Sequence, residues 1–391
     1  MLDGVNVALG VTGSIAAVRC VELIHEFKRH GATVRVVMSS AATDIVHPWS
    51  LEFASEHSVV TELTGAVEHI ELCAPDGWAD VFVVAPATAN TIGKVATGID
   101  DTPVTTCATT AVGSSLPLVV APAMHDPMYD HPVVDEHLET IAQRFDAEIA
   151  PPRMEENKAK IASDETIITA TARAVNEQPL NDHHIVVTSG STTESIDPVR
   201  ILRTRASGKT GRAVARALFV HGATVTLLHD GPRAYPFADV IQIESAAELE
   251  EAAVDAVTSA DAFVAAAAVS DFTTETRPEK IRSGEPITLD LQPTTKTIES
   301  IRTSAPELPI VGFKAESTDD DETLIEQARE LIKRYDLLFT VANDASVMGE
   351  DVTRVLVVTS GGVDELTGTK DRVAMGIVGH LATHLDQVRT K

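Results

Sequence analysis

Short apolar runs alternate with segments of helical period along the first half of the chain. Val5–Gly10 is an apolar run that leads into a turn at Val11–Ser14, and apolar side chains then recur at helical spacing over Ile15–Arg29. Because strands separated by helices form βαβ units, this alternation predicts a parallel sheet. Further strands are expected at Thr33–Met38, Asp80–Ala85 and Leu118–Ala121, and a further helix at Thr91–Thr97.

The second half repeats this arrangement after a polar, proline-containing linker at Glu177–His183. The sequence His-Gly-Ala-Thr-Val occurs at His30–Val34 and again at His221–Val225, each time between a first helix and a second strand. We therefore expect two tandem doubly wound α/β domains, Rossmann-like or flavodoxin-like, at residues 1–178 and 179–391, although a shared way of ending a helix would give the same echo. The expected elements are strands Ile185–Val187, Thr224–Leu228, Ala262–Ala268, Ile310–Phe313, Leu337–Val341 and Val355–Val358, and helix Gly211–Val220.

Composition agrees with this fold and limits the partners. Of the 391 residues, 44% are hydrophobic but only 4% are aromatic, so aliphatic side chains must build the cores. The net charge of −27, from 58 acidic and 31 basic residues, disfavours nucleic acid and anionic membranes as partners. We expect the acidity at a solvated surface, as in adaptation to high salt. Lysine or arginine within an acidic stretch then becomes a candidate phosphate ligand.

Cysteine usage and hydropathy indicate the compartment. Cys20, Cys73 and Cys107 show no paired metal spacing, which favours a reducing environment without a disulfide framework. No signal-peptide pattern is visible, and no apolar run approaches the roughly 20 residues that span a membrane. We expect a soluble, cytoplasmic protein.

Two strand-to-helix junctions in the first half carry candidate chemistry. Gly10–Ala17 combines glycines with a helix start, where free N–H groups can bind a phosphate. Ala85–Asn90 offers Thr88 and Asn90 as hydrogen-bonding side chains, and helix capping explains either residue taken alone.

The order of the motifs is more specific than any one of them. Gly13–Ala17, Ser39, Glu68–Leu72, Ala85–Asn90 and Pro122–Met124 follow one another, and in this order residues 1–175 resemble the flavin-containing cysteine decarboxylases. The resemblance implies bound FMN and a homo-oligomer. It also implies that the flavin is lined by Gly13, Ser14, Ile15, Ser39, Thr88 and Asn90.

His69 stands where that family has its catalytic histidine. The resemblance implies that it removes a proton while the thiol-bearing carbon of the substrate is oxidised, after which the carboxylate is lost as carbon dioxide. An imidazole titrates near neutrality, which suits this proton transfer. The alternative is a histidine with a purely structural role.

Two positions depart from the family pattern. The substrate clamp has His125 after Met124 where the family has Asn, so we expect substrate contact with an altered pH dependence. Residues 151–160, which match the family's lid, contain no cysteine to act as proton donor and look like the archaeal version. We expect Lys158 or Lys160 to hold the substrate or deliver the proton; the alternative is an exposed lysine on a mobile loop.

The second half carries a different set of motifs. Thr188–Arg200 follows the first strand, and Ala206–Gly211 places Ser-Gly-Lys at a helix start, where N–H groups, a hydroxyl and a cation suit a triphosphate. The spacing is neither a P-loop nor a dinucleotide fingerprint. Together with Ala266–Phe272, Pro278–Arg282, Val311–Glu316 and Val341–Asp344, these segments resemble phosphopantothenate–cysteine ligase over residues 182–388.

That resemblance implies a condensation activated by CTP. The substrate carboxylate attacks the α-phosphate to give an acyl-cytidylate and pyrophosphate, and the amine of cysteine then displaces CMP. Thr204, between Arg203 and Arg205, replaces an Asn that assists this breakdown, which leaves ATP open as the nucleotide. The implied residues are Lys280 in catalysis, Asp271 for nucleotide or Mg²⁺, Phe313 for the base, and Ser207, Gly208, Lys209, Arg329 and Lys333 for phosphates.

The two halves together resemble the bifunctional coenzyme A biosynthesis proteins, of archaeal type. The resemblance implies trimers of the first domain and dimers of the second, which together could close a dodecamer. Two alternatives are open: a related flavoprotein with another substrate, such as a peptide-cysteine decarboxylase or a flavin prenyltransferase, and a non-catalytic regulatory relative that binds flavin.

Overall fold

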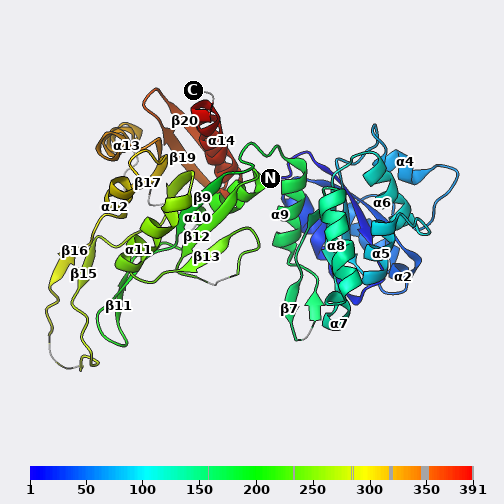
Figure 1. Cartoon of the computed structure of the whole chain (residues 1–391), viewed down its shortest axis with the longest axis horizontal. Coiled ribbons are helices and arrows are strands. Elements are labelled where there is room, and N and C mark those ends of the chain that lie inside the picture. Colours follow the sequence, from blue (N-terminus) through cyan, green and yellow to red (C-terminus); the bar gives the residue numbers. More distant parts are fainter. Residues whose placement is uncertain are drawn as a thin grey trace. The chain divides into compact units, whose positions relative to one another are not determined.

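The chain folds into two compact units, Met1–Glu177 and Gln178–Lys391, the first built around a parallel sheet and the second around a mostly parallel one (Figure 1). The computed structural model describes all residues except 157, 232–233, 283, 285, 317–319, 345–351 and 390–391. The predicted α/β class with doubly wound sheets is confirmed. None of the described helices is long and apolar enough to cross a membrane.

The first unit has a five-stranded sheet in the order β2-β1-β3-β4-β6, with all neighbours parallel. All seven residues of β3 are buried, as expected for a central strand covered on both faces. The strand order reverses between β1 and β3, so a ligand-binding crevice is expected at their carboxyl ends. The strands are β1 Asn6–Val11, β2 Thr33–Met38, β3 Val81–Ala87, β4 Leu118–Pro122 and β6 Glu148–Ile149.

Helices cover this sheet, and a small antiparallel sheet lies beside it. Side chains of α4, α5, α6 and α8 share one core with the strands, while α1 and α9 pack against the sheet as well. The small sheet has the order β5-β8-β7. The helices are η1 Ile15–Arg19, α1 Cys20–Arg29, α2 Ser40–Thr43, α3 Pro48–Ser55, α4 Glu68–Cys73, α5 Ala89–Thr97, α6 Pro103–Gly113, α7 Asp126–Tyr129, α8 Pro132–Arg144 and α9 Asp164–Val175; the small strands are β5 Met124–His125, β7 Arg153–Glu155 and β8 Lys158–Lys160.

The second unit has an eight-stranded sheet in the order β13-β12-β9-β14-β17-β18-β19-β20. The first six strands are parallel and the last two antiparallel. Its order reverses between β9 and β14, so a second crevice is expected there. The strands are β9 His184–Ser189, β12 Thr224–His229, β13 Asp239–Gln242, β14 Ala262–Ala265, β17 Ile310–Glu316, β18 Phe339–Asp344, β19 Val352–Val358 and β20 Val363–Thr369.

Alternating side chains of the central strands supply two cores. In β14, Ala262 and Val264 face α10 and α14, while Phe263 packs with α11 and α12 on the other face. Two hairpins extend from the sheet, β10 with β11 and β15 with β16 (Figure 1). The remaining elements are α10 Lys209–Val220, α11 Ala246–Ala256, η2 Val257–Ser259, α12 Thr297–Ser304, α13 Asp321–Tyr335, α14 Lys370–Arg389, β10 Thr193–Ser195, β11 Ile201–Arg203, β15 Phe272–Thr274 and β16 Leu291–Pro293.

The strand expected at Ala262–Ala268 ends early, at Ala265. The N–H of Ala267 donates to the Thr188 hydroxyl (3.0 Å) and that of Ala268 to the Gly190 carbonyl (2.9 Å). These bonds take the chain out of the sheet ladder and across the carboxyl end of β9. Smaller differences occur elsewhere: the first helix opens as a 3₁₀ turn, α10 begins at Lys209, and β18 runs Phe339–Asp344.

The repeated pentapeptide has the same structural role in both units. α1 ends at Arg29 and α10 at Val220, and the glycine that follows, Gly31 or Gly222, has φ of 92° or 102°. Only glycine adopts this left-handed conformation without strain. The repeated pentapeptide therefore forms the same kind of helix-ending turn in both units.

Substitution of Phe263 tests the core that this residue forms with α11 and α12, because its side chain is fully buried. We expect Phe263→Ala to lower the free energy of unfolding by about 3–5 kcal/mol, from lost burial and the cavity left behind. Phe272→Ala is the matched control, since Phe272 is 48% exposed and its loss should cost less than about 1 kcal/mol. Urea denaturation followed by circular dichroism measures both, and equal effects would contradict this core.

Candidate active sites

The predicted flavin-site residues of the first unit follow the strands that meet at its crevice. Gly13 and Ser14 follow β1, Ser39 follows β2, and Thr88 and Asn90 follow β3. Parallel strands end on one edge of the sheet, so these loops are neighbours. A hydrogen bond from the Thr12 hydroxyl to the Pro86 carbonyl (2.6 Å) ties the first loop to the third.

Gly13 lies where the chain leaves no room for a side chain. A Cβ atom at this position would approach the Cβ of Ala41, in α2, to 2.6 Å. The first loop thus packs main chain against the start of α2. Ser14 caps the 3₁₀ turn and Thr88 caps α5, while Ile15 is 78% exposed and Asn90 is exposed as well. Capping is therefore the contact that the structure shows for Ser14 and Thr88.

Three buried polar atoms of this unit have no hydrogen-bond partner among the described residues. They are Ser39 Oγ, His69 Nδ1 and Asp126 Oδ1. Polar atoms buried without a partner are costly, and they commonly mark a place where a ligand supplies the missing bond. Ser39 and His69 were predicted from their motifs, and His69 lies on helix α4 rather than next to a strand. Asp126 was missed, because a carboxylate at a helix start ordinarily indicates capping.

The small sheet joins the predicted clamp to the predicted lid. His125 of β5 lies directly opposite Lys158 of β8, and Lys158 lies opposite Glu155 of β7. Residues opposite one another project from the same face of a sheet, so these three side chains form one row. Met124 pairs in the same way with the buried Ala159.

The two lid lysines have different surroundings. Lys160 forms ion pairs with Glu156 (2.8 Å) and Glu155 (3.3 Å), and these hydrogen bonds raise its pKa. Lys158 is exposed and forms no ion pair with the residues that the structure describes. A lysine held in its charged form by carboxylates is a poorer proton donor, so the geometry separates two residues that the sequence treated alike.

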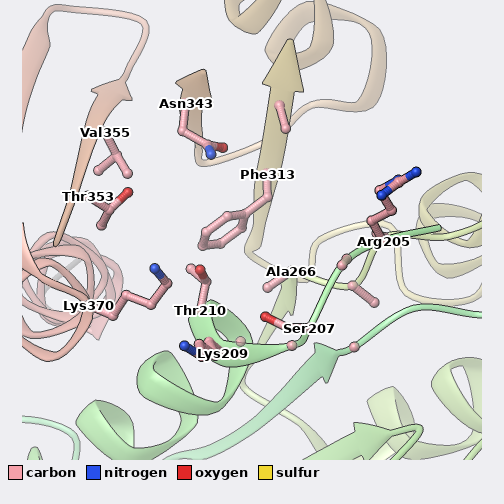
Figure 2. A pocket seen from close by; sticks show the side chains of 17 residues that line it. Arg205, Ser207, Lys209, Thr210, Ala266, Phe313, Asn343, Thr353, Val355 and Lys370 are labelled. Atoms are coloured by element: carbon pink, nitrogen blue, oxygen red, sulfur yellow. The ribbon is translucent and has the colours of Figure 1, made fainter. Parts of the chain in front are cut away.

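A cavity of about 210 Å³ lies at the carboxyl end of β9 in the second unit. Ser207, Gly208 and Lys209 line it at the start of α10, so the N–H groups of that helix face the cavity. Figure 2 shows the Phe313 ring pointing into it from β17 and Asn343 projecting from β18. Lys370 and Arg205 add two further cations to its lining.

Two glycines make this cavity possible. A Cβ atom on Gly208 would lie 2.9 Å from the Cα of Gly190, and one on Gly190 would overlap the Asp230 carboxylate. Both residues have positive φ, 71° and 91°. The Ser189 hydroxyl also donates to the Gly208 carbonyl (2.9 Å), which fixes the two loops against each other. Larger residues would push this turn away from the sheet.

The residues around Thr204 have separate environments. Arg203 donates to Ser191 Oγ (2.8 Å) and pairs with Asp230, so its guanidinium is held outside the cavity lining. Arg205 lines the cavity, whereas Thr204 is exposed and does not line it. Of the two arginines, Arg205 alone lines the cavity.

A second cavity of about 340 Å³ lies on the other side of β14. It shares Ala267 and Phe313 with the first, so the two cavities meet at the carboxyl ends of β14 and β17. Its polar lining includes Asp271, Lys296 and Lys314, among apolar and aromatic side chains such as Tyr335. Neither lysine was given a role from the sequence, although Lys314 lies within the Val311–Glu316 motif.

Several predicted residues lie apart from both cavities. Lys280 is exposed in the segment between β15 and β16, and Arg329 and Lys333 are exposed on α13. None of the three lines either cavity. The structure thus brings Ser207–Lys209, Asp271 and Phe313 together, and leaves these three cations outside.

Asp271 was predicted to bind Mg²⁺. Its Oδ1 atom accepts a hydrogen bond from Lys296 (2.7 Å). Within the described ranges, no group of three or more His, Cys, Asp or Glu side chains is arranged to hold a metal ion. One carboxylate paired with a lysine is not the donor set of a resident metal site.

Family models match both units. The flavoprotein family matches residues 1–176, and the family described as the C-terminal domain of DNA/pantothenate metabolism flavoproteins matches residues 180–385.

Named relatives match nearly the whole chain. The Coenzyme A biosynthesis bifunctional protein CoaBC of Thermococcus kodakarensis is 43% identical over 91% of this chain and 89% of its own. The protein of the same name from Methanocaldococcus jannaschii is 31% identical over 97% and 93%. Among solved structures, the C-terminal domain of a CoaBC protein matches 54% of this chain and all of its own, at 27% identity and a TM-score of 0.46.

Gly13 tests whether the first crevice holds a flavin. We expect Gly13→Ala to lose most of the bound flavin, because the new Cβ atom displaces either the first loop or α2. Visible absorbance per polypeptide after dialysis measures the flavin content. Gly65→Ala is the matched control, since nothing lies within 4 Å of its added Cβ atom. Unchanged flavin content in Gly13→Ala would contradict this placement.

Proposed function

The chain belongs to the family of coenzyme A biosynthesis bifunctional proteins, and we propose that it performs both of that family's reactions. In this proposal residues 179–391 condense 4′-phosphopantothenate with cysteine at the expense of CTP. Residues 1–178 then decarboxylate the resulting 4′-phosphopantothenoylcysteine to 4′-phosphopantetheine, with FMN as the flavin.

One observation carries the ligase half of the proposal: two cavities meet at Phe313 and Ala267. A condensation through an acyl-nucleotide must bring a carboxylate and the α-phosphate of a nucleotide into contact, and each needs its own binding site. Two adjoining cavities support such an arrangement, and both have cationic side chains in their lining. Positive charge there stabilises the charge that develops on the reacting phosphate.

The chemistry of the ligase half then divides into two steps. The carboxylate of 4′-phosphopantothenate attacks the α-phosphate, and pyrophosphate leaves. The amine of cysteine attacks the acyl carbon, loses a proton, and CMP leaves. We assign the α10 N-terminus, with Ser207, Gly208 and Lys209, to phosphate binding and Phe313 to the nucleotide base. Lys280, Arg329 and Lys333 remain predictions that require these exposed side chains to approach the bound substrates.

Mg²⁺ at Asp271 also remains a prediction. Magnesium is commonly held by one or two carboxylates together with nucleotide phosphates, so it would reach Asp271 with the nucleotide. Lys296 would have to give up its ion pair with Asp271 for this to occur. CTP rather than ATP, trimers of the first domain, dimers of the second and a dodecamer rest on the family resemblance.

Two buried polar atoms without a partner among the described residues, Ser39 Oγ and His69 Nδ1, support the decarboxylase half. Ser39 Oγ, together with the loops at Gly13 and Thr88, would hold the flavin, which when bound exchanges two electrons with the thiol-bearing carbon of the substrate. His69 takes the proton that this oxidation releases, and its Nδ1 atom has no competing partner among the described residues. Met124 and His125 contact the substrate from β5.

The lid supplies the returning proton in this proposal. Lys158 lies in a row with His125, which is the residue assigned to the substrate. Lys160 is occupied by Glu155 and Glu156. We therefore assign proton delivery or substrate holding to Lys158 in the first place, and to Lys160 an additional role in ordering the lid.

Turnover of the purified protein tests the whole proposal. With phosphopantothenate, cysteine and CTP, we expect CMP, pyrophosphate and carbon dioxide in equal amounts from a yellow protein. His69→Asn should abolish carbon dioxide release and leave CMP formation unchanged, because the two reactions use different units. A yellow protein that releases neither CMP nor carbon dioxide supports the regulatory alternative. CMP release without decarboxylation of the product supports a flavoprotein with another substrate.

The lid assignment predicts unequal effects of two similar substitutions. Lys158→Met should slow decarboxylation of supplied 4′-phosphopantothenoylcysteine by about 100-fold or more, the usual contribution of a positioned acid or base. Lys160→Met should have a smaller effect, because it removes ion pairs from the lid. Lys28→Met serves as the control, since Lys28 pairs with Glu56 on another part of the unit. Unchanged turnover in both lid variants would exclude a role for these lysines.

A further inference from the structure

Two hairpins of the second unit are joined by a ladder of hydrogen bonds between residues 192–200 and 270–281. The N–H of Ser270 donates to Thr192 Oγ1 (2.8 Å), and the N–H of Arg277 donates to the Ile196 carbonyl (2.9 Å). The hydroxyl of Thr276 adds a bond to the Ser195 carbonyl (2.9 Å). This ladder fixes the segment that carries Asp271 and Lys280 to the segment that follows β9.

The end of the ladder is a buried carboxylate. Asp197 is only 2% exposed, and its Oδ2 atom accepts a hydrogen bond from the N–H of Ile281 (3.0 Å). Its Oδ1 atom accepts from the N–H groups of Val199 and Arg200, both at 2.8 Å. The guanidinium of Arg200 pairs with Asp197 and also donates to the Ile281 carbonyl (2.9 Å). Both main-chain polar groups of Ile281 are therefore held from one point.

Ile281 directly follows Lys280, the lysine that the proposed function predicts to act in ligase catalysis. A lysine side chain rotates freely about its four-carbon stem, so the place of its main chain sets where its ammonium group can reach. The N–H and C=O bonds at Ile281 define that place within a long segment between β15 and β16. Among the described residues between β15 and β16, Ile281 alone donates a hydrogen bond to the Asp197 carboxylate.

We propose that Asp197 is a positioning residue of the ligase reaction, which acts by fixing the main chain of Ile281 and with it the position of Lys280. This inference rests on the catalytic assignment of Lys280. Asp197 itself touches neither cavity, so its removal changes the rate through Lys280 and leaves the binding surfaces for the substrates in place.

The charge of Asp197 supports this role. Burial alone would raise its pKa, but the hydrogen bonds from Ile281, Val199 and Arg200 hold the pKa at about 2. Because the folded value is lowered, the stabilisation is present above the unfolded pKa of about 4 and is lost as the pH falls toward about 2. Between about pH 5 and 9 the carboxylate stays ionised, so the effect of its removal should not vary with pH in that range.

Asp197→Asn in the full-length protein tests the inference. The amide nitrogen cannot accept from the N–H of Ile281, so we expect kcat for CTP-dependent pyrophosphate release to fall about 10- to 100-fold, with KM for CTP changed less than about twofold. Trypsin should cleave faster after Lys280 and Arg282. Decarboxylation of supplied 4′-phosphopantothenoylcysteine should be unchanged. Asp239→Asn, in the exposed edge strand β13, is the matched control and should match the wild type.

Combination with Lys280→Ala separates positioning from a general structural role. If Asp197 acts through Lys280, Asp197→Asn should cause no further loss in the Lys280→Ala protein. An equal loss in both backgrounds, or wild-type turnover of Asp197→Asn beside an inactive Lys280→Ala, would overturn the inference. Wild-type turnover of Lys280→Ala would instead overturn the catalytic assignment of Lys280.

A milder variant covers the case in which Asp197→Asn does not fold. Thr276→Val removes one bond of the ladder, at an exposed residue, and leaves the buried carboxylate intact. We expect a loss of severalfold in kcat and faster tryptic cleavage, again without a further loss when Lys280 is replaced. No change in either measurement would contradict the ladder's role.

Discussion

The constraint on which both units depend is the burial of parallel strands on both faces. Strands such as β3 and β14 are apolar on each side because helices cover both faces of the sheet. Their side chains therefore form the cores and present no polar group to a ligand. Chemistry is confined to the edge where the strands end. There the reversal of strand order, between β1 and β3 and again between β9 and β14, opens the space for a ligand.

Close approach of main chain shapes these spaces. Gly13 against Ala41 and Gly208 against Gly190 bring loops within distances that a Cβ atom would prevent. Single hydrogen bonds then hold the loops, from Thr12 to Pro86 in the first unit and from Ser189 to Gly208 in the second. The sites are therefore built from tight turns on a rigid sheet, and their side chains project from fixed positions.

The chain is acidic overall, and at these sites several of its basic side chains are paired with acidic ones. Basic side chains gather on the row of the small sheet and around the two cavities, and several of them have acidic partners. Lys160 pairs with Glu155 and Glu156, and Lys296 pairs with Asp271. Such pairs keep cations in place without a ligand. An incoming phosphate or carboxylate must then compete with the resident acid, which favours ligands of high negative charge.

The sequence by itself determined the α/β class, most of the strands, and the motif residues at the loops after β1, β2 and β9, because hydrophobic period and glycine placement are local properties. It could not find Lys296 or the role of Asp197, because their partners Asp271 and Ile281 are distant in the sequence. It could not separate Lys158 from Lys160, because the geometry of the small sheet decides which lysine reaches Glu155 and Glu156. Nor could it single out Asp126 or Lys314, because burial and a place in a cavity are tertiary properties. The strand expected to reach Ala268 also stopped at Ala265, since bonds to Thr188 and Gly190 outweighed local propensity. Only the tertiary structure decides such pairings, because register and strand order bring segments together that no local pattern relates.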